Sequence, residues 1–168
     1  IYGSLTLSSD MTFAGSSTPV TTFAATSGTK TITTNGKTLL FAIAFNGTGG
    51  TFQLQDPLTV SGSLTIHAGT LDMSSGNHSL TVRGNWSNPG GSFLARNGTV
   101  TFDRPAGIQT VDNGPSSFHR VTHAGDGTLQ LQGNGMTVAG DFLNRAGTVD
   151  ANGLSLAVGG DFTNAATF

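Results

Sequence analysis

One short pattern of residues occurs four times along the chain. Each copy opens with an apolar residue, Thr or Ala, and a second apolar residue, and then continues through a glycine-containing turn into a further apolar residue. The copies begin at Leu58, Leu80, Met136 and Leu156. In the first three copies, a further apolar residue closes the copy directly after Gly-Thr or Gly-Ser. The number of positions from the opening to the closing apolar residue, such as Leu58 and Leu71, is the same in all three. Such self-similarity indicates a chain built by stacking one supersecondary unit.

A longer repeat covers most of the chain and divides it near residue 100. The segment 23–32 aligns with 102–111, and the segment 50–55 aligns with 127–132, at nearly equal offsets. A shorter spacing also recurs, because Leu80 and Val100 are as far apart in sequence as Met136 and Leu156. We take this spacing as the length of one rung, that is, one turn of the repeat. We therefore predict one repeat domain over 1–168, made of two long units at about 22–100 and 101–168, with about four rungs of roughly 20 residues in each.

The composition favours strands and turns over helices. Charged residues make up 10% of the 168 residues, against roughly 25% in an ordinary soluble domain, and there are 25 glycines. All nine acidic residues are aspartates, and Lys occurs only at Lys30 and Lys37, so the strong helix formers Glu and Lys are nearly absent. Because Thr, Val, Phe and Gly favour strands and turns, we expect an all-β fold, with an early turn at Gly15 to Pro19.

A rung of this size holds two or three short strands and cannot bury its apolar side alone. Stacking in register lets apolar residues point inward, so we predict a right-handed parallel β-helix (a β-solenoid) of about 7–8 rungs, spaced about 4.8 Å apart. A β-sandwich or a propeller fits less well, because both prefer antiparallel hairpins. The alternating pattern places twelve residues in the predicted core: Leu58, Val60, Leu80, Val82, Trp86, Phe93, Met136, Val138, Phe142, Leu156, Val158 and Phe162.

Polar residues recur at the same place in successive copies. Asn88, Asn144 and Asn164 follow the aromatic residue of their copy by two positions, while Asn85, Asp141 and Asp161 precede it directly. We predict a structural role, either as ladders of hydrogen-bonded amides between rungs or as caps of the turns. The alternative is an aspartate column that coordinates calcium. The glycine-rich nonapeptide of calcium-binding β-rolls is absent from the sequence, and we assign no metal ligand and no cofactor site.

The sequence shows no catalytic motif, and we predict that the protein is not an enzyme. His119 and His123 are four positions apart, which on a strand separates them by about 13 Å, too far for one metal ion. The alternative function is binding or cleavage of glycans, where cleavage would use two carboxylates roughly 5–9.5 Å apart. Nothing in the sequence selects a pair from the aspartates that stand beside turns: Asp72, Asp103, Asp126 and Asp150.

Threonines occupy outward positions between inward apolar residues. They are Thr59, Thr81 and Thr137, with Thr65 and Thr101 in similar strands. Thr suits the exposed side of a strand, which accounts for the pattern. A flat threonine array is also a surface that orders water or binds ice. Ice binding is the less favoured alternative, because Ala157 and the insertions around 112–128 interrupt the array.

Charge and hydropathy exclude several classes of partner. The net charge is −2 and the arginines form no basic run, which argues against binding to nucleic acid or to an anionic membrane. No apolar run approaches the roughly 18 residues of a membrane helix. The lack of Cys excludes disulfides and thiolate metal sites. Because the sequence opens on Ile1 without a leader and closes within a repeat, we expect a segment of a longer chain.

The pattern Leu-Thr-Val-x-Gly-Asp-Phe-x-Asn, present with Met in first place at 136–144, and Gly-Thr-Val-Thr-Phe at 98–102 resemble repeats of bacterial extracellular β-solenoid proteins. These include filamentous-haemagglutinin-like adhesins and autotransporter passenger domains. The resemblance implies secretion, a cell-surface location and a structural or adhesive role without catalytic residues. Open solenoid ends expose unpaired strand edges. We therefore expect the ends to stack on neighbouring repeats or on further copies, with surface glycans as candidate partners.

Overall fold

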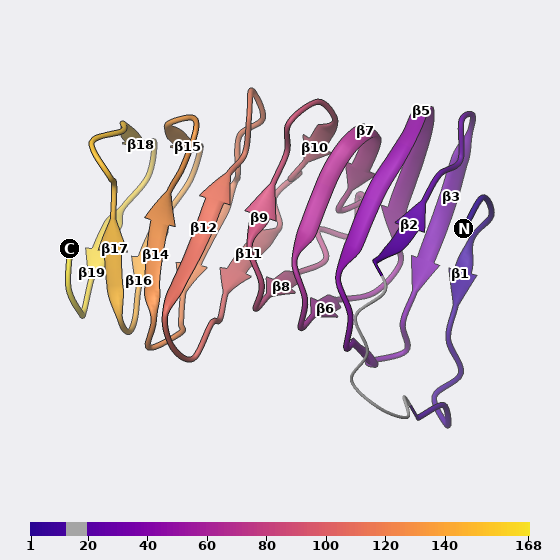
Figure 1. Ribbon diagram of the computed structural model, residues 1–168, viewed down its shortest axis with the longest axis horizontal. Helices are drawn as coiled ribbons and strands as arrows, with labels where there is room; N and C mark the ends of the chain where they lie inside the picture. The colour runs from indigo at the N-terminus through magenta and orange to yellow at the C-terminus, as the bar shows by residue number, and fades with distance from the viewer. Residues whose placement is uncertain (13–19) are drawn as a thin grey trace.

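The computed structural model describes residues 1–12 and 20–168, and every helix or strand assigned within them is a strand. The strands wind into about seven turns of about 21 residues, so the predicted all-β parallel solenoid is confirmed. Figure 1 shows the turns following one another along the long axis, with the two termini at opposite ends. The turn predicted at 15–19 lies outside the described residues.

Strands of successive turns stack in parallel and form three faces of the solenoid. On the first face, Ile43, Leu64, Trp86 and Val111 lie in register, each one turn beyond the last. The strands of this face are β2 (Thr21–Phe23), the start of β5 (Ile43–Leu54), the start of β7 (Leu64–Asp72), β9 (Trp86–Ser87), β12 (Ile108–Asp112), β14 (Thr128–Leu131) and β17 (Thr148–Asp150).

The other two faces are built in the same way. The second face contains β1 (Leu5–Thr6), β3 (Thr29–Thr33), the ends of β5 and β7, β10 (Ser92–Leu94), β15 (Met136–Val138) and β18 (Leu156–Val158). The third contains β4 (Thr38–Leu39), β6 (Leu58–Val60), β8 (Leu80–Val82), β11 (Thr99–Phe102), β13 (Arg120–His123), β16 (Phe142–Asn144) and β19 (Phe162–Asn164). Because β5 and β7 run through the first two faces, hydrogen bonding joins most strands of these faces into one ten-stranded sheet, whereas β15 and β18 of the second face form a separate two-stranded sheet.

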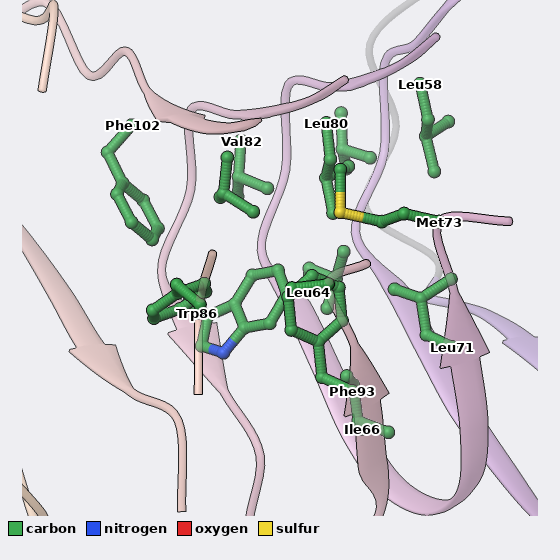
Figure 2. Packing of buried hydrophobic residues seen from close by; sticks show 14 of the residues in the cluster. Leu58, Leu64, Ile66, Leu71, Met73, Leu80, Val82, Trp86, Phe93 and Phe102 are labelled. Carbon is green, nitrogen blue, oxygen red and sulfur yellow. The ribbon is translucent and has the colours of Figure 1, made fainter. Parts of the chain in front are cut away.

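An apolar core runs along the axis between the three faces. Figure 2 shows Leu58, Leu80 and Val82 of the third face in a row along one wall, with Trp86 and Phe93 opposite. The rings of Trp86 and Phe93 meet edge to face, with centroids 4.9 Å apart. Nine of the twelve residues predicted for the core are buried: Leu58, Val60, Leu80, Val82, Trp86, Phe93, Met136, Val138 and Phe142.

The last turn departs from the expected core. Leu156 and Val158 are only half-buried, and Phe162 is 41% exposed. Phe162 stacks on Phe142 of the previous turn, with ring centroids 5.4 Å apart. On its other side, the described residues supply no further turn to cover it. An inward side chain of a solenoid is buried only when a turn lies on both sides of it.

The two long sequence repeats occupy different positions around the axis. Phe23 lies on the first face, whereas its counterpart Phe102 lies on the third. Likewise the segment 51–54 lies on the second face, whereas 128–131 lies on the first. The second long repeat therefore begins four turns after the first, less one face, so each of its segments lies one face earlier around the axis than its counterpart. All three faces accept the same apolar-polar-apolar strand, so the pattern recurs in sequence while its place in the cross-section shifts.

Glycines allow close backbone contact at the corners between faces. Gly62 and Gly84 stack at the corner that joins the third face to the first, where Gly84 N donates a hydrogen bond of 3.2 Å to Gly62 O. A Cβ atom on Gly84 would lie 2.3 Å from backbone atoms of Gly62 and Ser63. Only glycine fits such an approach, so this corner constrains the sequence through packing.

Candidate functional site

The amide ladder forms between two of the three predicted asparagines. Asn144 is buried, and its Nδ2 donates a hydrogen bond of 2.7 Å to Oδ1 of Asn164, one turn further along the axis. Asn88 lies at a different corner, because its copy of the repeat is one face out of phase. Its Nδ2 donates to Asn113 O and to Ser116 Oγ. The equivalence of Asn88 and Asn144 in sequence therefore does not bring them together.

Two of the three residues that precede the aromatic positions, Asn85 and Asp141, cap backbone groups at corners, whereas the side chain of Asp161 caps no backbone group among the described residues. Oδ1 of Asp141 accepts a hydrogen bond of 3.0 Å from the backbone N–H of Asp161, and Oδ1 of Asn85 accepts one of 3.1 Å from that of Thr110. In each case the acceptor serves the next turn of the solenoid. In the part of the chain that the structure describes, no group of three or more His or Asp side chains is placed to hold a metal ion.

His123 is buried in a column that continues through the asparagine ladder. It lies in register between Phe102 and Asn144, and its Nδ1 is 2.9 Å from Oδ1 of Asn144. Its Nε2 is buried and has no hydrogen-bond partner among the described residues. Burial lowers the pKa of His123 below 6.5, and the hydrogen bond with Asn144 opposes this to a smaller extent. His123 is thus a neutral core side chain at neutral pH.

Asp72 is the most deeply placed of the candidate aspartates. Its side chain is 4% exposed, and Arg96 donates to both carboxylate oxygens at 2.9 and 3.0 Å. Burial is the largest single influence on the pKa of Asp72 and raises it. The hydrogen bonds from Arg96, Ser74 and Gln53, together with the charge of Arg96, outweigh burial and hold the pKa below its ordinary value. Asp72 is thus committed to a structural ion pair.

The remaining candidate aspartates differ in their surroundings. Asp103 pairs with Arg83 on the third face at 3.0 Å. Asp150 lies on the first face, where hydrogen bonds from Gln130 and from the backbone of Asn152 hold its pKa below the ordinary value. Asp126 is exposed at a corner. Of these four aspartates, Asp72 and Asp103 are thus paired with arginines.

Five threonines stack in an unbroken column on the third face, which we call the threonine column: Thr38, Thr59, Thr81, Thr101 and Thr122. Neighbouring members are in register on successive turns, about 4.8 Å apart. Leu143 follows Thr122 and interrupts the column. Thr137 pairs with Ala157 on the second face and Thr65 lies on the first, so neither of these two predicted members belongs to it.

The first face carries a polar hollow of about 570 Å³, which we call the first-face hollow. Its floor consists of two rows of side chains that run along the axis, with members of each row one turn apart. Gln132 and Gly133 line its side, and the buried Trp86 lies beneath the floor. The two rows are Ser63, Asn85 and Thr110, and Thr65, Ser87 and Asp112.

Sequence reasoning missed both of these surfaces as assemblies. It named Asn85 as a turn residue and Thr65 as an outward threonine, but it did not join them to Ser87 and Asp112. It also omitted Thr38 and Thr122 from the threonine column. In each case the sequence signal is an outward polar residue between two inward apolar residues. Whether such a residue belongs to one of these surfaces depends on which face its strand occupies.

The described residues contain no helix long and apolar enough to cross a membrane. No protein-family model, curated protein or solved structure matches the chain. The resemblance to bacterial adhesin repeats is therefore supported at the level of the β-solenoid fold alone.

Proposed function

We propose that the chain is a structural and adhesive β-solenoid module of a secreted bacterial protein, at the cell surface or in a filament, and that it has no catalytic activity. The proposal rests above all on the parallel β-solenoid itself, whose turns stack on one another along one axis. The composition, with few charges and no Cys, and the resemblance of the repeats to those of bacterial adhesins agree with it.

The last turn combines two features that favour stacking. Among the described strands, β18 pairs only with β15 and β19 pairs only with β16, so each has an unpaired edge. Beside these edges lies an apolar hollow of about 350 Å³, lined by Leu156, Val158, Phe162 and Phe168. Unpaired backbone groups next to exposed apolar side chains form a template for another strand.

The opposite end of the solenoid has a matching edge. Among the described strands, β1 pairs only with β3, and it lies on the second face, as β18 does. After β19 on the third face, the chain returns to the first face, where Thr167 bridges to Thr148. The next face around the axis is the second. We infer that the last turn stacks on a further turn of the same kind, supplied either by neighbouring repeats of the same chain or by a second copy placed head to tail with β1 on β18.

Sedimentation velocity and electron microscopy over a concentration series test this proposal. We expect oligomers that lengthen with concentration and rods with a repeat near about 4.8 Å. Phe162→Glu should abolish association, while Leu94→Glu, at a side chain of equal 41% exposure on β10, should not. Circular dichroism checks that both variants keep the β fold. A protein that stays monomeric throughout the series would contradict the assembly.

The threonine column supports a second candidate function, which is binding to ice. Its five members, each with a hydroxyl and a methyl group, lie in register at one spacing along the third face and are partly exposed. Measurement of thermal hysteresis tests this function. We expect activity in the natural sequence, loss in Thr81→Tyr, and retention in Thr70→Tyr on the second face. Absence of hysteresis in the natural sequence would exclude ice binding.

A further inference from the structure

We propose that the first-face hollow binds a neutral polysaccharide, which lies along the solenoid axis across three turns. This inference rests on the proposed adhesive role, because it names the ligand class that an adhesive module would hold. It is carried by the geometry of the two polar rows, by the hydrogen-bonding groups left unused in them, and by the charges around the hollow.

The floor of the hollow is periodic in the direction of a bound polymer. Thr65, Ser87 and Asp112 are in register on three successive turns, so their side chains repeat about every 4.8 Å along the axis. The second row, Ser63, Asn85 and Thr110, stands two positions away along the same strands. Two rows of short polar side chains can therefore meet successive units of one extended chain from two sides.

Most polar side-chain groups of this floor have no protein partner. The hydroxyls of Thr65, Ser87 and Thr110 make no hydrogen bond with any described residue, and neither does the side-chain amide of Gln132. Asn85 uses its Oδ1 on the backbone of the next turn, which leaves its Nδ2 as a donor toward the hollow. The buried Asn144, in contrast, uses both its Oδ1 and its Nδ2 on protein partners. A surface with this inventory suits a ligand rich in hydroxyl groups.

Among the described residues that line the hollow, Asp112 alone carries a charge. Its Oδ1 accepts hydrogen bonds of 2.9 Å from Gly114 N and from Nδ2 of Asn134, which secure the carboxylate at the edge of the floor. Its Oδ2 has no such partner among the described residues and is available to accept from sugar hydroxyls. Because no Lys or Arg belongs to this lining, a carboxylated or sulfated glycan would meet Asp112 without a compensating cation. The lining therefore selects neutral sugars.

A neighbouring hollow of about 610 Å³ has the opposite character. It shares Ser63 with the first-face hollow, lies at the corner formed by Gly62 and Gly84, and is lined by Arg83 and Arg104. If the ligand were acidic, these arginines would hold it. The two hollows thus give different predictions for the charge of the ligand and for the substitutions that weaken binding.

The single carboxylate also separates binding from cleavage. Hydrolysis of a glycosidic bond ordinarily uses two carboxylates on either side of the bond. In the described lining of the hollow Asp112 has no second carboxylate beside it, which supports retention of the polysaccharide without turnover.

The test is binding of the whole protein to immobilised neutral polysaccharides (laminarin, xylan and mannan) and acidic ones (alginate and heparin). We expect binding to at least one neutral polysaccharide, weakened at least about tenfold by the double variant Thr65→Val/Ser87→Ala, which removes two hydrogen-bonding groups. Asp112→Asn should weaken it also. The control Thr70→Val/Ser92→Ala removes the same groups from residues in register on the second face and should bind as the natural sequence does.

Several outcomes would overturn the inference. These are binding to no neutral polysaccharide, equal loss in the control variant, or binding to acidic polysaccharides alone with loss in Arg83→Gln/Arg104→Gln. Circular dichroism confirms that each variant is folded, so a loss of binding is not a loss of structure. The sedimentation series separates this inference from the proposed assembly: rods without glycan binding overturn only the site, and glycan binding by a strict monomer overturns only the end-to-end stacking.

Discussion

Asn144 donates a hydrogen bond of 2.7 Å from its side-chain amide to Oδ1 of Asn164, the residue in register with it on the next turn. The same amide donates to the backbone oxygen of Thr167 at 2.8 Å, and Oδ1 of Asn144 is 2.9 Å from His123 Nδ1. One buried side chain therefore joins three strands of the chain around the final corner. In a solenoid with few ion pairs among its described residues, such contacts hold neighbouring turns in register.

Replacement of Asn144 by Leu should lower the free energy of unfolding by about 1–3 kcal/mol, because His123 and Thr167 would lose their buried partner. Urea denaturation measures the change. Asn97→Ala, at an exposed residue, should alter stability by less than about 0.5 kcal/mol. Equal effects of the two substitutions would show that the ladder adds nothing to stability.

The fold could be predicted because one strand pattern at one period has few ways to bury its apolar residues. The position of each strand around the axis could not. The segments 58–60 and 136–138 have the same apolar-Thr-apolar form, yet the first lies on the third face and the second on the second face. Both positions satisfy the same local rule of inward apolar residues, so the choice depends on how many residues each corner uses.

The candidate surfaces depend on that same choice. Thr59 and Thr81 are neighbours in the threonine column, while Thr137, which has the same local sequence setting, is on another face. Asn85 joins Ser63 and Thr110 in one row only because three turns stack in register there. The sequence pattern also could not predict which residues of the last turn are buried, because the burial of an aromatic side chain there depends on what covers its outer side.

A matched pair of substitutions tests the unequal burial of two aromatic residues that are in register. Phe142 is 1% exposed and Phe162 is 41% exposed. Phe142→Ala should lower the free energy of unfolding by about 3–5 kcal/mol through the cavity it leaves. Phe162→Ala should cost about 1 kcal/mol in the monomer. Denaturation at low protein concentration measures both changes, and similar costs would contradict the open last turn.

The stacked corner glycines give a prediction about backbone packing. Gly84→Ala should cost about 1–3 kcal/mol of stability, because its Cβ would lie 2.3 Å from the backbone of Gly62 and Ser63, and the corner must shift to admit it. Thermal unfolding followed by circular dichroism measures the loss. Gly3→Ala serves as the control, since a Cβ there has no neighbour within 4 Å, and its effect should stay within about 0.5 kcal/mol. A neutral Gly84→Ala would show that this corner is loosely packed.

His123 should make stability depend on pH in the mildly acidic range. Burial lowers its pKa in the folded state, whereas in the unfolded state the pKa is about 6.5. Above pH 6.5 the ring is neutral in both states and stability is complete. As the pH falls below about 6.5, the unfolded state binds a proton that the folded state refuses, so the free energy of unfolding decreases until the pH reaches the folded-state pKa.

Urea denaturation at a series of pH values measures this dependence. The series runs from about pH 7.5 to about pH 4.5, which is about 2 units below the ordinary His pKa. His123→Asn, which keeps an amide in the column beside Asn144, should flatten the curve in this range, while His119→Asn leaves the buried ring in place and should preserve it. Asp72 and Asp150 act in a separate window. Their pKa values lie below 3.8, so the stability they contribute is lost only as the pH falls through those lower values. An unchanged slope in His123→Asn would assign the mildly acidic dependence to other groups and contradict the burial of an uncharged ring at this position.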